Sequence, residues 1–262
     1  MITKKEIVRL GVVLTGFIIA GLWNYLSTRS NMELSVTSYF RIFSGNVNLL
    51  FQLAFLMTFF VFIVSRFYMM QHHHFDNFII TRISYAKYYR KSCYAVFCTT
   101  FIVMLLFHIS MFVVPLLLHY HYVPYQIERE MVLFYGNMGV DIAIYMLLSS
   151  LGMGLFFMVL YAASYLIHNK YIYYVLPCCV IFCSLIVFVA ISSFINGNFY
   201  ITGKSLDMVR TICCMITPMN LYTPGLMFES YGWISFLSSC LLYVAAFIIL
   251  TKLTTRMRMK YD

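Results

Sequence analysis

Three consecutive histidines, His72, His73 and His74, are the side chains in this sequence that most suggest metal chemistry. Imidazole nitrogens are common ligands of zinc and other transition metals. Three neighbours cannot all face one metal on a regular helix, because only residues three or four apart share a face. His119 and His121 could meet on an extended segment, but no further ligand accompanies them. We therefore predict a solvated collar at the three histidines and no metal site.

The segment Gly203-Lys204-Ser205 is similar to the end of a phosphate-binding loop. That loop also needs a glycine five residues before its second glycine. The position here is Asn198, and the nearby Gly197 is one place out of register. The segment also follows an apolar run, with no buried strand before it. We predict no nucleotide site and no cofactor in this chain, so ATP and magnesium, if used, must be bound by a partner.

Carboxylates are scarce, with nine aspartates and glutamates in the whole chain. Asp141 is the only one close to an apolar run, and acids inside a membrane often mark function. A single acid at the end of a run is more typical of a residue at headgroup level. No glutamate pair, Ser/His set or His-Glu-x-x-His helix is present. We therefore predict that the chain has no catalytic site.

The composition indicates which kind of fold holds these residues in place. The chain has 262 residues, of which 62% are hydrophobic and 10% charged, whereas soluble domains are roughly 45–50% apolar. An apolar run of ~20 residues crosses the ~30 Å of bilayer hydrocarbon as a helix. We predict an all-α polytopic membrane protein, with residues 1–262 forming a single transmembrane domain. The net charge of +9 sets orientation and indicates no nucleic-acid partner.

Six apolar runs are readable as transmembrane helices. Their approximate bounds are 10–26, 47–64, 94–118, 140–167, 172–195 and 233–251. If the N-terminus is inside, 13 Lys and Arg residues lie on the inner side and 5 on the outer side. Inner loops of membrane proteins carry the excess of basic residues. We predict six spans with both termini cytoplasmic, in the plasma membrane.

A polar interruption at residues 75–91 lies on the predicted inner side, between the second and third runs. Its first half has apolar residues at spacings of three and four, which form one helical face: Phe75, Phe78, Ile79 and Ile83. Its second half is interpreted as a basic, tyrosine-rich hinge. The pattern suits a short helix that transmits force from a soluble partner. Taken alone, it suits better an interfacial helix anchored by Tyr, Lys and Arg at the headgroups.

The connection before the last run is the longest, and it is not uniformly polar. An apolar piece at 212–216 is broken by Thr217-Pro218-Met219-Asn220, and residues 222–228 are apolar again. Two short apolar pieces around a proline are typical of segments that enter a membrane face without crossing it. We predict a re-entrant outer helical hairpin centred on Ile216, Thr217, Pro218 and Met219.

This layout resembles the permease subunit of bacterial type-2 ABC exporters over the whole chain. The best local matches are residues 79–84 and 88–91, similar to the family's coupling segment, and residues 216–219, similar to its outer hairpin. The resemblance implies a cytoplasmic coupling helix at about 75–84 that contacts the ATPase subunit through Phe75, Asp76, Phe78, Ile79, Arg82 and Ile83.

The resemblance also implies a mechanism. Two permeases pair, as a homo- or heterodimer, and each rests on an ABC ATPase. Closure of the ATPases pushes the coupling helices and opens the pathway outward, a rigid-body switch between two states. The cargo implied is amphiphilic, such as an antimicrobial peptide, a lipid-like compound or a drug. Two other functions stay open: an ion-coupled secondary carrier, and a membrane scaffold or sensor that moves nothing.

Overall fold

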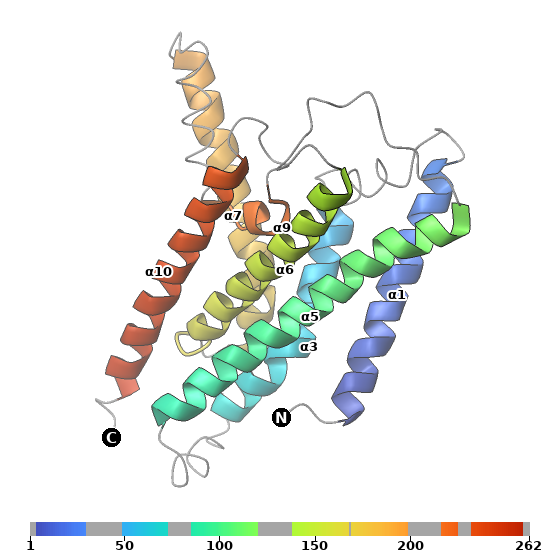
Figure 1. Cartoon of the computed structure of the whole chain (residues 1–262). Helices are drawn as coiled ribbons and strands as arrows, with labels where there is room; N and C mark the ends of the chain where they lie inside the picture. The colour runs from blue at the N-terminus through green and yellow to red at the C-terminus, as the bar shows by residue number, and fades with distance from the viewer. Residues whose placement is uncertain are drawn as a thin grey trace.

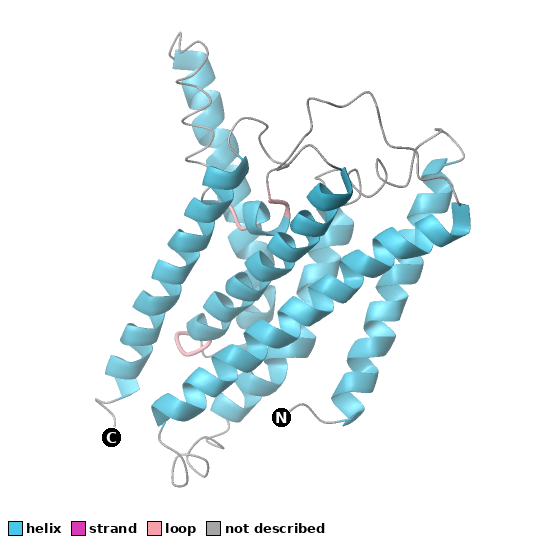
Figure 2. Ribbon diagram, viewed as in Figure 1, coloured by secondary structure: helices cyan, strands magenta, loops and turns pink. Residues whose placement is uncertain are grey.

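A computed structural model describes residues 4–29, 49–72, 85–119, 138–167, 169–198, 216–224 and 232–258. Within these ranges every regular element is a helix, and no strand is present (Figure 2). The helices are α1 (Lys4–Arg29), α3 (Leu49–His72), α5 (Tyr85–His119), α6 (Met138–Ala163), α7 (Lys170–Asn198), α9 (Met219–Tyr222) and α10 (Gly232–Arg258). The prediction of an all-α chain is confirmed for the described residues.

Four of these helices are long and apolar enough to span a membrane. Their apolar stretches are Lys87–Val114, Gly139–Ala163, Lys170–Ile191 and Ser235–Thr254. Two further helices, α1 and α3, carry shorter apolar stretches, Val8–Trp23 and Leu53–Ser65. Several apolar helices of this length are what a membrane protein requires, because only a closed hydrogen-bonded backbone is stable in hydrocarbon.

One helix begins earlier than predicted, which corrects the assignment of residues 85–91. These basic and tyrosine-rich residues form the first two turns of α5, which begins at Tyr85, and are no hinge. The prediction followed hydropathy, which marks where a helix is apolar and not where it starts. Lys, Arg and Ala favour helix strongly, so the backbone of α5 continues through them.

α7 contains a proline, Pro177. It is the eighth residue of α7 and lies inside the helix. Proline has no N–H, so the carbonyl of Tyr173 receives no bond from it at this point. α7 nevertheless continues to Asn198, because a single lost bond leaves the others of a long helix in place.

The helices pack around α6, and Figure 1 shows them running alternately up and down. The contact of α6 with α5 is the most extensive, followed by its contact with α10. α7 packs on α3, which also contacts α5 and α6. α1 packs on α5. α1 begins and α10 ends at the same end of the bundle (Figure 1). The turn between α6 and α7, residues 164–169, lies at this end too.

Gly154 allows α5 and α6 to approach closely. A Cβ atom at this position would lie 2.9 Å from two ring carbons of Phe97 on α5. That distance is shorter than any ordinary carbon–carbon contact. The ring therefore fills the space that a side chain on α6 would otherwise occupy.

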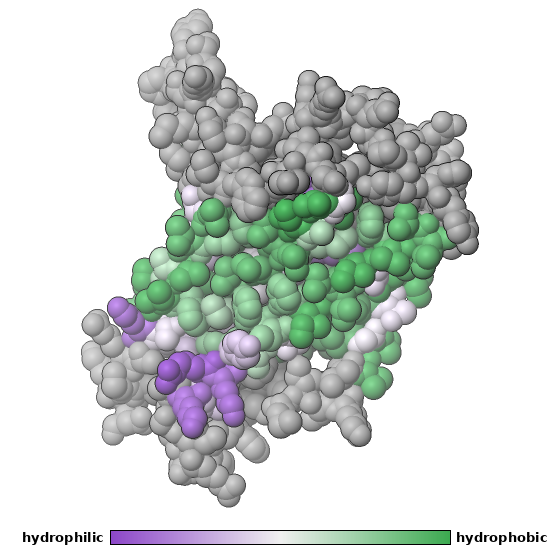
Figure 3. All heavy atoms as spheres, in the orientation of Figure 1, coloured by the Kyte–Doolittle hydropathy of each residue, from purple (hydrophilic) through white to green (hydrophobic). Residues whose placement is uncertain are grey.

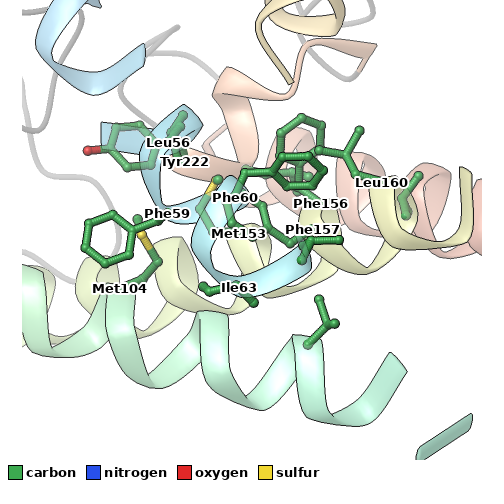
Figure 4. Close-up of a cluster of buried hydrophobic side chains, with 14 of the residues drawn as sticks. Leu56, Phe59, Phe60, Ile63, Met104, Met153, Phe156, Phe157, Leu160 and Tyr222 are labelled. Carbon is green, nitrogen blue, oxygen red and sulfur yellow. The ribbon is translucent and has the colours of Figure 1, made fainter. Parts of the chain in front are cut away.

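The core is largely aromatic and lies where α3, α5, α6 and α9 meet (Figure 4). Phe55 stacks on Phe107 with ring centroids 4.1 Å apart, and Phe60 meets Phe157 edge-on at 5.3 Å. Such pairs add to the free energy gained by burying their large surfaces. The outer faces of α7 and α10 are apolar and exposed, and an apolar band covers the middle of the molecule (Figure 3).

Candidate functional site

The segment 216–224 is the least regular part of the bundle interior. Pro218 precedes the single helical turn α9, with φ −58° and ψ −24°, and Thr223 ends it. Every residue from Thr217 to Pro224 is buried, whereas Ile216 is exposed. A short helix leaves most of its backbone carbonyls and N–H groups without partners of its own. In an apolar bundle these groups must be satisfied by side chains from neighbouring helices.

The carboxyl end of α9 is held by hydroxyl groups of α6. The Ser149 hydroxyl donates to the Tyr222 carbonyl oxygen at 2.6 Å, and the Tyr145 hydroxyl donates to the same oxygen at 3.4 Å. The ring of His108, on α5, lies behind Ser149, with 3.0 Å between Nε2 and Oγ. All these groups are buried. The broken backbone of α9 is thus tied to two spanning helices at once.

The direction of these bonds assigns a proton to His108. The single hydroxyl proton of Ser149 goes to the Tyr222 carbonyl, so its Oγ must accept from the imidazole. Nε2 of His108 therefore carries hydrogen, an assignment drawn from the network. The chain of donors runs from His108 through Ser149 to the backbone of α9. In a surrounding of low polarity, each bond of such a chain strengthens the next.

The opposite side of α9 is tied to α10. The Asn220 side-chain amide donates to Ser235 Oγ at 2.9 Å and to Ser239 Oγ at 2.7 Å. The Tyr243 hydroxyl donates to the Ile216 carbonyl at 3.0 Å. The three α10 residues are spaced by four, so they form one stripe along the helix. The stripe gives α10 a polar face toward the segment, although most of its surface is apolar.

Gly152 lets the segment lie directly on α6. A Cβ atom here would be 3.0 Å from both the Cα and the carbonyl carbon of Leu221. Backbone atoms cannot move aside as a flexible side chain can. The segment therefore touches α6 through its main chain, and its position follows the position of α6.

Asp141 lies on the same face of α6 as Tyr145 and Ser149, at spacings of four. We expected a residue at headgroup level, and in the structure its side chain is buried, with only 2% exposed. It sits in the first turn of α6, where the positive end of the helix dipole favours a carboxylate. With His108 it gives this half of the bundle two buried ionisable side chains.

The predicted coupling residues Phe75, Asp76, Phe78, Ile79, Arg82 and Ile83 lie outside the described residues. Their two flanking helices are described and pack on the 164–169 turn. On the α3 side, the Tyr68 hydroxyl donates to the Ile167 carbonyl at 3.2 Å. The same ring stacks on Tyr173 of α7, with centroids 4.6 Å apart and planes 15° apart.

The α5 flank is held in the same manner. Tyr89 stacks on Tyr161 with centroids 5.9 Å apart and meets Tyr165 at 5.7 Å. Its hydroxyl lies 3.5 Å from Thr251 Oγ1 on α10. Both ends of the interval 73–84 are therefore fixed by tyrosine rings to the lower ends of α6, α7 and α10.

The four residues predicted for the outer hairpin lie in the segment 216–224. Thr217, Pro218 and Met219 are buried, and Ile216 marks the entry. His72 ends α3 and His119 ends α5, whereas His73, His74, His121 and residues 203–205 lie outside the described ranges. Among the residues that are described, no three His, Cys, Asp or Glu side chains gather as a metal site.

Sequence reasoning missed the side chains that hold the segment in place. His108 was detectable, because it is a lone ionisable residue within the apolar run 94–118, and such residues mark functional positions. The stripe of Ser235, Ser239 and Tyr243 was also detectable by its spacing. Ser149 was not, since nothing local distinguishes it from its neighbour Ser150, which bonds its own helix at Met146.

Comparisons of the chain with family models, with curated proteins and with solved structures found no match. What the site does is therefore inferred from its own residues.

Proposed function

We propose that this chain is the membrane-spanning subunit of a type-2 ABC exporter in the plasma membrane. It forms the pathway for an amphiphilic cargo together with a second permease, and a separate ABC ATPase supplies the energy. The observation that carries the proposal is the buried segment 216–224. It turns at Pro218 and is held by hydrogen bonds from α6 and α10, with His108 of α5 bonded in turn to Ser149 of α6.

Six spans with both termini cytoplasmic suit the dimensions of the helices. α1 and α3 have 26 and 24 residues, so each is about 36–39 Å long at ~1.5 Å per residue. That length exceeds the ~30 Å of hydrocarbon, although their apolar stretches are shorter. The exposed basic side chains Lys87, Lys91, Lys170 and Lys252 lie on helix ends at the end where α1 begins (Figure 1). The positive-inside rule makes that end cytoplasmic.

The proposed mechanism passes through the two flanks of residues 73–84. An ATPase that pushes on this interval moves the lower ends of α3 and α5. Tyr68 and Tyr89 transfer the movement to the α6–α7 turn and to α10. Because Leu221 rests on Gly152, a shift of α6 reaches the segment 216–224 at the far end. The segment then exchanges one set of hydrogen bonds for another, as a two-state switch requires.

The test is a double variant at the predicted coupling face. The chain is produced in its native host, where any partner ABC ATPase is present, and Phe78→Ala is combined with Arg82→Glu. A buried Phe at an interface centre typically contributes ~2 kcal/mol or more, and the charge reversal removes an orienting pair. We expect ATPase copurification and cargo transport to fall by about tenfold or more, with unchanged insertion.

The matched control is Asn77→Ala with Thr81→Glu, which falls on another face of the predicted helix and should copurify normally. An interfacial anchor without a partner predicts altered membrane insertion in the test variant instead. Normal transport and normal copurification in the test variant would refute the coupling assignment. The absence of any copurifying ATPase with the unmodified chain would refute the exporter itself.

One observation favours a second function, that of an ion-coupled carrier. His108 is buried against Tyr222, and Asp141 is buried on the helix that carries Ser149; carriers use buried ionisable groups as relays. A carrier moves its cargo without an ATPase. Proteoliposomes containing this chain alone would then transport in response to a proton gradient, and Asp141→Asn would abolish that transport.

A further inference from the structure

One exposed stripe of α5 changes from basic to apolar along its length. Lys87, Lys91 and Tyr94 come first, at spacings of four and three, and Ile102 and Leu106 continue the same face. Residues at these spacings lie above one another on a helix. Tyr94 is 70% exposed and Ile102 54% exposed. The cations therefore stand on an exposed side of α5, and its outward apolar residues follow at steps of four that wind gradually around the helix.

The basic cluster is unfavourable for α5 taken alone. Lys87, Arg90 and Lys91 are like charges at relative positions 0, 3 and 4, which repel on a helix surface. They also lie in the first two turns, where the helix dipole disfavours cations. An anion placed against this face would relieve both effects. The cluster thus has the charge and the position of a binding surface for an anionic group.

The surroundings add charge of the same sign. Thr251 of α10 lies 3.5 Å from the Tyr89 hydroxyl, so Lys252 is at the same level as Arg90. Lys170 of α7 lies over the ring of Tyr171, 5.0 Å from its centroid. The charged residues of α5, α7 and α10 at this end are all basic, and hydrophilic residues gather here below the apolar band (Figure 3).

We propose that Lys87, Arg90 and Lys91 bind the phosphate group of an anionic phospholipid in the adjoining leaflet. Tyr94 lies at the boundary, and an acyl chain lies along Ile102 and Leu106. Twelve residues separate Tyr94 from Leu106, about 18 Å of helix, which matches the ~15 Å depth of one leaflet. The inference rests on α5 spanning a membrane and does not depend on the exporter proposal.

A soluble acidic partner is a poorer match for this stripe. Such a partner would approach along the helix axis, from beyond the end of the bundle. The cations instead stand on the exposed side of a helix whose outward residues further along, Ile102 and Leu106, are apolar and suited to contact with acyl chains. Tyr between the charged and apolar parts is the usual arrangement at the headgroup level.

The test measures lipid preference at one point of the stripe. In a background of Trp23→Phe and Trp233→Phe, the substitution Tyr94→Trp places a single reporter beside the cations. The protein is reconstituted in phosphatidylcholine vesicles containing brominated phosphatidylglycerol or brominated phosphatidylcholine, and fluorescence quenching gives their relative binding constants. Each cation near an anionic membrane surface contributes on the order of fivefold. We expect phosphatidylglycerol to bind about threefold to tenfold better than phosphatidylcholine at 50 mM salt. At 500 mM salt this preference should be smaller, because salt screens the charges.

Two controls keep the result specific. Leu117→Trp places the reporter at the far end of the same stripe, on a residue that is 66% exposed, and should show no preference. The triple change Lys87→Gln, Arg90→Gln and Lys91→Gln should lower the ratio of the two lipid binding constants at position 94 to about one. If the triple variant does not fold, Lys87→Gln and Lys91→Gln taken singly should each lower it.

Equal binding of the two lipids at position 94, or a preference that survives the glutamine changes, would overturn the proposal. Loss of ATPase copurification in the triple variant, without any lipid preference in the parent, would assign the surface to the soluble partner instead. That outcome would leave the exporter proposal standing and remove this one.

Discussion

The two ends of α6 are held by different chemistry. At the end near α9, the contacts are hydrogen bonds of defined direction, from His108 through Ser149 to Tyr222, and from Asn220 to α10. At the other end, tyrosine rings stack on each other and only a few of their hydroxyls bond a carbonyl. Directed bonds between buried groups are either made or lost, at a cost. Stacked rings can slide while most of their contact area is kept.

This difference suggests separate roles for the two regions of α6. The stacked end is suited to receive a movement of α3 and α5, because stacked rings can shift by small steps. The hydrogen-bonded end suits a place where movement must become a discrete change, because intermediate positions leave buried polar groups without partners. Variants at each end should therefore differ in both size and kind of effect.

The largest effect is expected where the segment 216–224 rests on α6. Gly152→Leu places a side chain where the backbone of Leu221 lies, so the segment has to leave its position. We expect a loss of about 3 kcal/mol or more in the free energy of unfolding, since overpacking adds to the lost hydrogen bonds. Gly11→Leu is the matched control, because nothing lies within 4 Å of a Cβ there. Thermal unfolding in detergent measures both, and equal stability of the two variants would show that the segment is not seated on α6.

A smaller effect is expected from the hydrogen bonds alone. Ser149→Ala removes the main donor to the Tyr222 carbonyl and the acceptor of His108, at a cost of roughly 1–3 kcal/mol. Thr100→Val is the control, because its hydroxyl is equally buried but has no hydrogen-bond partner among the described residues, so little change is expected. Chemical denaturation compares the two, and a Ser149→Ala variant as stable as the Thr100→Val variant would contradict the proposed role of the network.

The smallest effect is expected at the stacked end. Tyr68→Phe keeps the ring on Tyr173 and removes only the bond to the Ile167 carbonyl, at a cost of about 0.5–1.5 kcal/mol. Tyr68→Leu removes the stack as well and should cost clearly more. The same unfolding assay ranks them. A Phe variant that is as damaged as the Leu variant would show that the hydroxyl, and not the ring, holds this end.

Sequence alone predicted the features that depend on composition and on local chemistry. Apolar runs located the helices, and Pro218 located the break before α9, because proline has no N–H to continue a helix. The start of α5 was wrong, since the polarity of residues 85–91 concealed a helix that their propensities favour. The partners of α9 could not be predicted, because His108 and Ser149 are separated from Tyr222 by more than 70 residues and meet only through helix packing.

The turn at residues 164–169 has a consequence for how the protein is made. Its backbone is closed by bonds from Ser164 N–H to the Tyr161 carbonyl and from Leu166 N–H to the Ala163 carbonyl, and Asn169 caps α7 through the N–H of Tyr171. Six residues reach at most about 20 Å, less than the ~30 Å of a bilayer core. In the proposed membrane topology, α6 and α7 therefore insert as a hairpin, and the orientation of the first decides that of the second. An α6 that inserts the wrong way round takes α7 with it.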